Sequence, residues 1–92
     1  MIISFAHKGL KLFYNEDDPS KLPASQLPKI RRILTRLDAA THPEIMREPG
    51  YKFHELTGNR KGTYSVTVTG NYRITFSFIG ENAVDVNYED YH

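Results

Sequence analysis

Apolar residues in the first half of the chain recur at helical spacing. Residues 2–5 predict a short first strand, and residues 7–14 predict a brief helix that ends in the polar loop 15–20. A longer helix is expected to begin at about Pro23 or Pro28, because proline is tolerated in a first turn, and to end near Ala40. Its apolar positions are Leu27, Ile30, Ile33, Leu34 and Leu37. One further turn is expected at 43–47.

The second half of the chain has the pattern of strands. Segments 51–56, 63–69, 72–79 and 83–88 are rich in β-branched and aromatic residues, and turns that contain glycine separate them. Short connections of this kind join antiparallel neighbours. The pattern therefore predicts one α+β domain over residues 1–92, with an antiparallel sheet of four to five strands and the N-terminal helices packed on one face.

Side-chain parity predicts a strand register, because directly opposed residues of an antiparallel pair point to the same face. Apolar residues should therefore meet apolar residues. For the second and third of these strands the expected pairs are Val66–Phe76, Val68–Ile74 and Thr69–Arg73, around a loop at 70–72. For the third and fourth they are Ile74–Tyr88, Phe76–Val86 and Phe78–Val84, around a loop at 80–82, and Phe53 is expected opposite Val66.

This register gives the sheet an apolar and a polar face. The apolar face, expected against the helices, carries Phe53, Val66, Val68, Ile74, Phe76, Phe78, Val84 and Val86. The polar face carries His54, Ser65, Thr67, Arg73, Thr75, Ser77, Asn87 and Glu89. His54, Asn71 and Arg73 should converge at one end of it with the terminal run 90–92. Strict alternation would turn Asp90 and His92 to the apolar face. Both follow the last apolar residue of the strand, however, so strand geometry need not apply to them.

Composition narrows the class of protein. The chain has 92 residues, of which 39% are hydrophobic and 25% charged, as in a small globular domain. It shows neither a long apolar run nor the pattern of a secretory signal, so we expect no membrane association and a cytoplasmic location. Cysteine is absent, which excludes disulfide scaffolds and thiolate zinc sites.

Basic residues are gathered locally, although the net charge is only +1. One group lies in the predicted long helix and is best interpreted as its solvated face: Lys29, Arg31, Arg32 and Arg36. A second group, Lys52, Arg60 and Lys61, lies at or near a turn, where basic side chains have fewer structural roles. The second group is therefore the candidate for contact with RNA.

The residues expected at the end of the polar face suit cleavage of RNA without a metal. Histidine exchanges protons near neutral pH, so His54 and His92 can divide the work of general base and general acid. Asp90 can orient or activate an imidazole. Four histidines include no metalloprotease-type pair four residues apart, so we expect no metal site and no cofactor.

The remaining candidates would contact the RNA. Arg73 can bind non-bridging phosphate oxygens, Tyr91 can stack on or hydrogen-bond the nucleotide, and Asn71 can read a base edge. Each has a simpler interpretation. Arg73 opposite Glu89 can be a surface ion pair, Asn71 suits a turn with positive φ, and terminal residues are often free to vary.

The sequence resembles the HigB toxins of the RelE superfamily. The resemblance rests on residues 51–62 (YKFHELTGNRKG), 65–68 (SVTV), 71–76 (NYRITF) and the final DYH, and extends to 1–5 and 7–10. It implies a RelE-like microbial ribonuclease fold and a ribosome-dependent endoribonuclease that cuts mRNA in the decoding site, leaving a cyclic phosphate and a free 5′-hydroxyl. It also implies a helix-turn-helix antitoxin of the HigA type, with operator DNA bound only through the complex.

Within that family, functional importance falls on residues that match His54, Asn71, Arg73, Asp90, Tyr91 and His92. Thr57 departs from the family, because relatives commonly carry a basic residue there; Arg60 or Lys61 would have to compensate through the turn 58–62. Two other interpretations stay open. One is a non-catalytic module that binds RNA or a regulatory protein, and the other, weaker for want of a recognition helix, is a DNA-binding repressor subunit.

Overall fold

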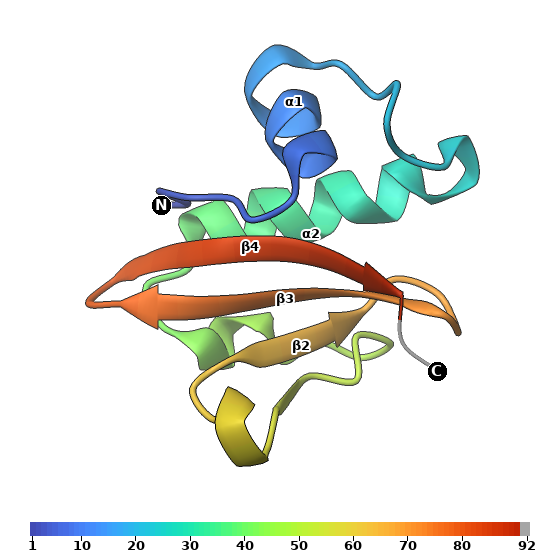
Figure 1. Ribbon diagram of the computed structural model, residues 1–92. Helices are drawn as coiled ribbons and strands as arrows, with labels where there is room; N and C mark the ends of the chain where they lie inside the picture. The colour runs from blue at the N-terminus through green and yellow to red at the C-terminus, as the bar shows by residue number, and fades with distance from the viewer. Residues whose placement is uncertain (91–92) are drawn as a thin grey trace.

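The computed structural model describes residues 1–90 and has two layers, with helices on one face of a sheet (Figure 1). The helical layer holds α1 (Lys8–Glu16), η1 (Ala24–Gln26), α2 (Leu27–Ala39) and η2 (Pro43–Met46). The sheet consists of β1 (His54–Glu55), β2 (Tyr64–Thr67), β3 (Tyr72–Ile79) and β4 (Asn82–Asp90), and the short helix η3 (Gly58–Arg60) follows β1. The strands are antiparallel neighbours in chain order. The predicted α+β architecture is confirmed.

Both helices form where apolar spacing predicted them. The His7 side chain caps α1, since its Nδ1 accepts the Leu10 N–H at 3.2 Å and satisfies one of the free donors of the first turn. Helix α2 begins with proline in its first turn, where the missing N–H costs nothing. Its predicted inward residues Ile30, Ile33, Leu34 and Leu37 are fully buried, and Leu27 is partly buried against the core.

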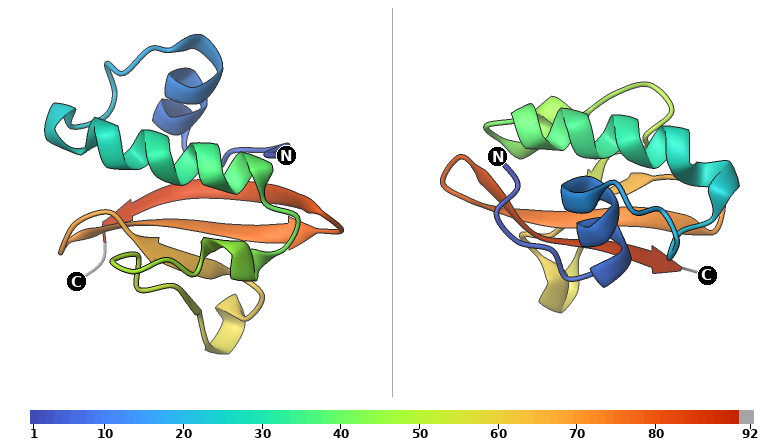
Figure 2. Two further views of the ribbon diagram at one scale, coloured as in Figure 1. Left: turned by 180° about the vertical axis from the view of Figure 1, so that it is seen from behind. Right: turned by 90° about the horizontal axis from the view of Figure 1, so that it is seen from above.

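The N-terminal segment runs along the outer side of β4 (Figure 2). It makes two isolated parallel bridges, Ile2 to Ala83 and Phe5 to Val86, instead of the continuous first strand that its sequence predicted. The Ile2 N–H donates to the Asp38 carboxylate at 2.8 Å, which ties the segment to α2 as well. The chain start thus joins the two layers.

The predicted register of β2 against β3 is wrong by two residues. The observed pairs are Tyr64–Phe76, Ser65–Thr75, Val66–Ile74 and Thr67–Arg73. Tyr64 stacks on Phe76 with ring centroids 6.0 Å apart, and on Phe53 at 5.6 Å, so aromatic pairing outweighs the valine–aromatic pairing that was assumed. The N–H groups of Val68 and Thr69 both donate to the Tyr72 carbonyl and close the turn. A shift of two preserves parity, so each residue keeps its predicted face.

A β-bulge divides the pairing of β3 with β4. The predicted pair Ile74–Tyr88 is confirmed, but beyond the irregularity at Thr75/Ser77 the pairs are Ser77–Val84, Phe78–Ala83 and Ile79–Asn82. The connecting turn is therefore 80–81, and Phe78–Val84 is wrong. At the bulge, β4 has one residue more than β3, and Asp85 lies there with a φ of 54°.

The bulge also changes what packs in the core. Ala83 joins the cluster between sheet and helices, whereas Val84 shares the face of Ser77 and lies outside that cluster despite its burial. Val66, Ile74, Phe76 and Val86 are fully buried in the cluster, as predicted. None of the helices within residues 1–90 has the length and apolar character needed to cross a membrane.

Candidate functional site

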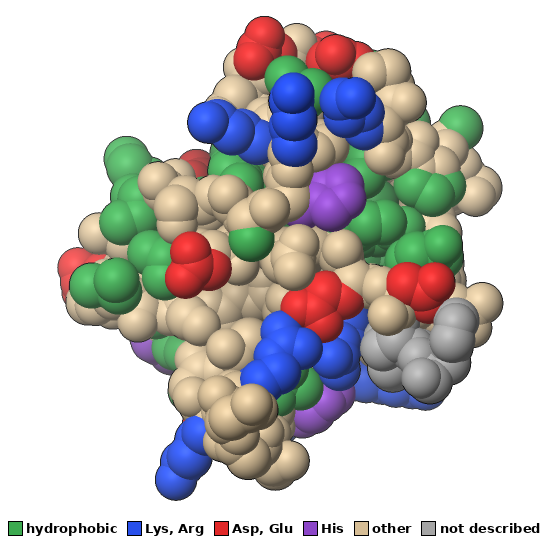
Figure 3. Space-filling view, in the orientation of Figure 1, with side chains coloured by type: hydrophobic (Ala, Val, Ile, Leu, Met, Phe, Trp, Pro, Cys, Tyr) green, Lys and Arg blue, Asp and Glu red, His purple; other side chains and the backbone are tan. Residues whose placement is uncertain are grey.

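The polar face of the sheet carries two rows of side chains across the strands. Strand pairing places His54, Ser65, Thr75 and Asn87 in one row. It places Thr67, Arg73 and Glu89 in the next. Figure 3 shows acidic, basic and histidine side chains close together on this side of the molecule. The eight residues predicted for the polar face keep that face, because the error in the β2–β3 register preserved parity, and the bulge adds Val84 to it.

His54 is exposed, and its ring contacts the main chain that directly precedes β1. Its Nδ1 lies 2.9 Å from the carbonyl oxygen of Lys52. A carbonyl can only accept, so Nδ1 carries the proton in this contact, and in the neutral ring Nε2 is left as the proton acceptor. Lys52 has a φ of 50°, a backbone conformation that few residues other than glycine adopt, and its carbonyl points at the His54 ring. The main-chain carbonyl of Lys52 therefore favours the His54 tautomer that carries its proton on Nδ1.

Glu89 is the centre of the largest polar network on this face. Its Oε1 accepts from Arg60 Nη1 at 3.0 Å and from Arg73 Nη2 at 3.1 Å and Nε at 3.3 Å. Its Oε2 accepts from Arg60 Nη2 at 2.6 Å, Thr75 Oγ1 at 2.9 Å and Asn87 Nδ2 at 3.4 Å. One carboxylate thus holds two guanidiniums side by side.

The network strongly favours the ionised carboxylate. Hydrogen bonds from Arg60, Thr75 and Arg73 lower the pKa of Glu89 to about 2, against an opposing effect of burial. The hydrogen bonds to Glu89 in turn raise the pKa of Arg60. The side chains of Glu89 and Arg73 are 17% and 16% exposed, whereas that of Arg60 is 42% exposed. Arg60 is therefore the guanidinium of this pair that solvent and ligands reach more readily.

The sequence pattern indicated no role for Glu89 in the site. Its place opposite Arg73 was foreseen, but only as an alternative surface ion pair. The partner of Glu89 that the sequence did not indicate is Arg60, which lies 29 residues away in η3 and reaches across the sheet to β4. A turn residue has no place in a strand ladder, so register arithmetic could not bring it to Glu89.

Asp90 lies in a different row from the one expected. Strand pairing continues to the end of β4 and sets Asp90 opposite Tyr72, on the face of the sheet that packs against the helices. Tyr72 and Tyr88 stack there with ring centroids 5.0 Å apart and planes 1° from parallel. Burial first, then Tyr72 and Asp90, raise the pKa of Tyr88 to about 12. Asp90 is thus placed beside this stack, at the same end of the sheet as Arg73 but by register on the other face.

The other predicted residues lie around the polar face. Lys52 and Lys61 are exposed, and Asn71 is exposed in the β2–β3 turn, where its N–H donates to Thr69 Oγ1 at 3.4 Å. Thr57 is exposed at the start of η3, so the departure from the family pattern lies directly before the turn that carries Arg60. Tyr91 and His92 lie outside the described residues. Among residues 1–90, no group of three or more histidine, aspartate or glutamate side chains is placed to hold a metal ion.

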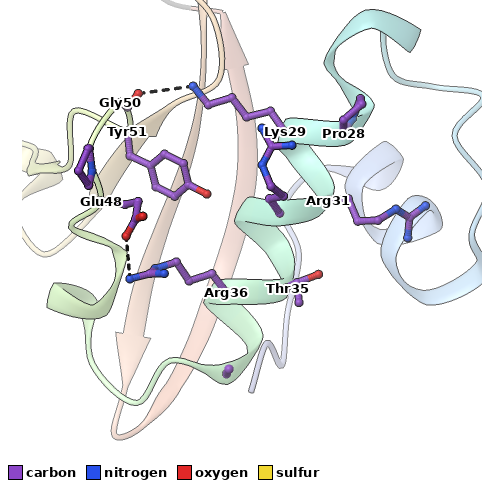
Figure 4. A pocket seen from close by; sticks show the side chains of 11 residues that line it. Pro28, Lys29, Arg31, Thr35, Arg36, Glu48, Gly50 and Tyr51 are labelled. Atoms are coloured by element: carbon purple, nitrogen blue, oxygen red, sulfur yellow. Dashed lines mark hydrogen bonds and ion pairs between the residues drawn. The ribbon is translucent and has the colours of Figure 1, made fainter.

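A groove on another part of the surface runs between α2 and residues 48–51 (Figure 4). None of the predicted site residues that the structure describes lines it. Arg36 pairs with Glu48 at 3.0 Å, and Lys29 Nζ donates to the Gly50 carbonyl at 3.4 Å. On the side of α2 toward α1, Arg31 pairs with Asp17 at 2.8 Å. These contacts agree with the interpretation of the first basic group as a solvated helix face.

Comparison with known proteins places this geometry in a family. Residues 3–92 match the family model described as the RelE-like toxin of the type II toxin-antitoxin system HigB. The chain belongs to the HigB-like toxin family. It is 46% identical to the endoribonuclease HigB of Proteus vulgaris over 92 residues, with both chains covered completely. It is 36% identical over 94 residues to toxin HigB-1 of Vibrio cholerae, covering 100% of this chain and 98% of the relative.

Solved structures agree on the fold of this HigB-like toxin. YafQ from E. coli superimposes with a TM-score of 0.56 at 13% identity, covering 98% of this chain and 93% of the other. The YoeB/ParE toxin of Agrobacterium tumefaciens gives a TM-score of 0.56 at 15% identity, with 100% and 99% covered. The toxins of type II systems act with an antitoxin, so an antitoxin partner follows from the family.

Proposed function

We propose that this HigB-like toxin is a metal-independent endoribonuclease that cleaves mRNA on the ribosome and so inhibits translation and growth. The observation that carries the proposal is the contact of His54 Nδ1 with the Lys52 carbonyl, which leaves Nε2 of the neutral ring as proton acceptor on a polar face that also holds two arginines. A relative of 46% identity over the whole chain is named an endoribonuclease, which supports the same activity here.

The proposed reaction begins at His54. Its Nε2 removes the proton of a ribose 2′-hydroxyl, and the oxygen attacks the adjacent phosphorus. The arginines stabilise the negative charge that gathers on the non-bridging oxygens. The bond from phosphorus to the 5′-oxygen then breaks, and that oxygen takes a proton from His92. The products are a 2′,3′-cyclic phosphate and a free 5′-hydroxyl.

The remaining site residues complete the assignment. We assign Asp90 and Tyr91 to the same catalytic set, to orient the acid and to contact the nucleotide. Lys52, Lys61 and Asn71 would bind the RNA from the rim of the polar face, where all three side chains are exposed. Ribosomes would supply much of the positioning, which suits a chain of net charge +1 acting in the cytoplasm.

The partner proposed to restrain this activity is a helix-turn-helix antitoxin of the HigA type. Operator DNA would be bound through that complex and not by the toxin alone, in keeping with helices α1 and α2, which both pack against the sheet and its core.

Matched histidine variants test the activity. Purified wild-type protein is added to ribosomes that carry a defined message, and the cut sites are mapped. We expect His54→Ala to abolish cleavage and His42→Ala to retain it, since His42 is also exposed but lies at the start of η2. Binding of the message complex without cleavage by the wild type would instead support a non-catalytic binding module.

A further inference from the structure

We propose that Glu89 is a positioning residue, which holds the Arg60 guanidinium on the polar face so that Arg60 contacts the RNA phosphate. The inference rests on the proposed ribonuclease function and reassigns the two arginines. Arg60 becomes the residue that touches the phosphate, and Arg73 becomes part of the base that anchors Glu89.

The contacts of Arg60 support this role. Both of its terminal nitrogens bind Glu89, at 3.0 and 2.6 Å, in the two-point geometry that fixes the plane of a guanidinium. A guanidinium has five N–H donors, and this arrangement uses only one on each terminal nitrogen. The Arg60 side chain is 42% exposed, so its outer donors can reach a phosphate. Glu89 therefore orients Arg60 without consuming it.

The contacts of Arg73 suit an anchor. Its Nε and Nη2 both donate to Glu89 Oε1, and its side chain is only 16% exposed. Thr75, which is 1% exposed, donates its hydroxyl to the other oxygen of Glu89. Two residues of β3, Arg73 and Thr75, thus hold the carboxylate independently of Arg60.

The origin of Arg60 explains why it needs such a holder. It ends η3, in a turn bounded by Gly58 and Gly62 with φ of 68° and 95°, and its main chain is not part of the sheet. Glu89 lies on β4, at the other edge of the strand order from β1. Without the carboxylate, a long side chain on a glycine-flanked turn would sample many positions, and misplacement by about 1 Å can lower a rate by about 100-fold.

The variant Glu89→Gln, which removes the charge but keeps the size of the side chain, tests the proposal on ribosome-bound message. We expect kcat to fall about 10- to 100-fold with a smaller change in KM, because the lost contact positions a group for the transition state. Glu81→Gln, the same change of charge at the exposed β3–β4 turn, should match the wild type. Thr75→Val, which removes one donor to Glu89 but leaves both arginines paired, should keep most of the activity.

A double variant separates positioning through Arg60 from an independent or merely structural role. If Glu89 acts through Arg60, Arg60→Ala combined with Glu89→Gln should be no slower than Arg60→Ala alone. Multiplicative losses would overturn the proposal, as would wild-type kcat in folded Glu89→Gln. Trypsin should also cut native Glu89→Gln faster after Lys61, since the turn is released. Failure of the wild type and of Glu81→Gln to cleave would instead count against the ribonuclease function itself.

Discussion

The Nδ1 atom of His54 lies 2.9 Å from the carbonyl oxygen of Lys52. Only the main chain of Lys52 takes part, so the contact depends on the backbone bend at φ 50° and not on the lysine side chain. It leaves Nε2 of the neutral ring as the acceptor. This contact supports the proposed assignment of His54 as the base.

The bound tautomer can be observed directly. When the His54 ring is neutral, nitrogen-15 NMR should show its proton on Nδ1. Lys52→Ala should preserve this state, because the main-chain carbonyl remains. Exogenous imidazole should partly restore cleavage to His54→Ala, since that variant lacks only the base. A proton on Nε2 of His54 would contradict the assigned role.

Lys61 should contribute charge and little stability. Its side chain is exposed in the turn after η3, so Lys61→Ala should change the free energy of unfolding by less than about 0.5 kcal/mol. If it contacts a phosphate, the variant should bind RNA more weakly and lower the slope of log affinity against log salt by about 1. Binding measured across a salt series checks this, and an unchanged slope would remove Lys61 from the RNA-binding set.

Glu89 should make stability depend on pH in the acid range. Its pKa is about 2 in the folded protein and near 4.5 when unfolded, so its stabilisation is complete above about pH 4.5 and disappears as pH falls toward 2. The difference between these two pKa values corresponds to about 3 kcal/mol. Urea unfolding of Glu89→Gln should show that loss at neutral pH and a flatter decline between pH 4.5 and 2. The same acid decline in the variant and the wild type would show that other carboxylates cause it.

Tyr88 should produce a smaller effect at alkaline pH. Burial is the largest cause that raises the pKa of Tyr88 to about 12, and the Tyr88 hydroxyl donates to Gln26 Oε1. The unfolded chain ionises this tyrosine near pH 10, so its contribution is complete below pH 10 and is lost as pH rises toward 12. Tyr88→Phe should lose about 1 kcal/mol at neutral pH and then decline less than the wild type from pH 10 to 12. Equal declines would place the titration elsewhere.

The fold could largely be predicted because periodicity and parity are local signals. Helix α2 and strands β2 to β4 formed where apolar spacing indicated, and the polar face was assigned correctly. The choice of partner across two strands is not a local signal. Stacking of Tyr64 on Phe76 moved the β2–β3 register by two residues from the predicted one. No sequence signal indicated the bulge at Asp85. Because of the bulge, Ala83 packs in the core in place of Val84.

The candidate site was only partly predictable, because alternation places residues on strands but not residues in turns. His54 and Arg73 lie on strands, so parity placed them on the polar face. Arg60 lies on a turn, and its contact with Glu89 depends on where that turn folds over the sheet, which the alternation of strand residues does not determine. Asp90 was expected to escape strand geometry, but β4 continues far enough to include it.

The chemistry of the cut ends tests the account most directly. Wild-type protein and the His54→Ala variant are incubated with ribosomes that carry a defined message, and both new ends are analysed. Attack by the 2′-hydroxyl predicts a 2′,3′-cyclic phosphate on the upstream fragment and a 5′-hydroxyl downstream, formed only by the wild type. A 5′-phosphate on the downstream fragment, or equal cleavage by His54→Ala, would contradict it.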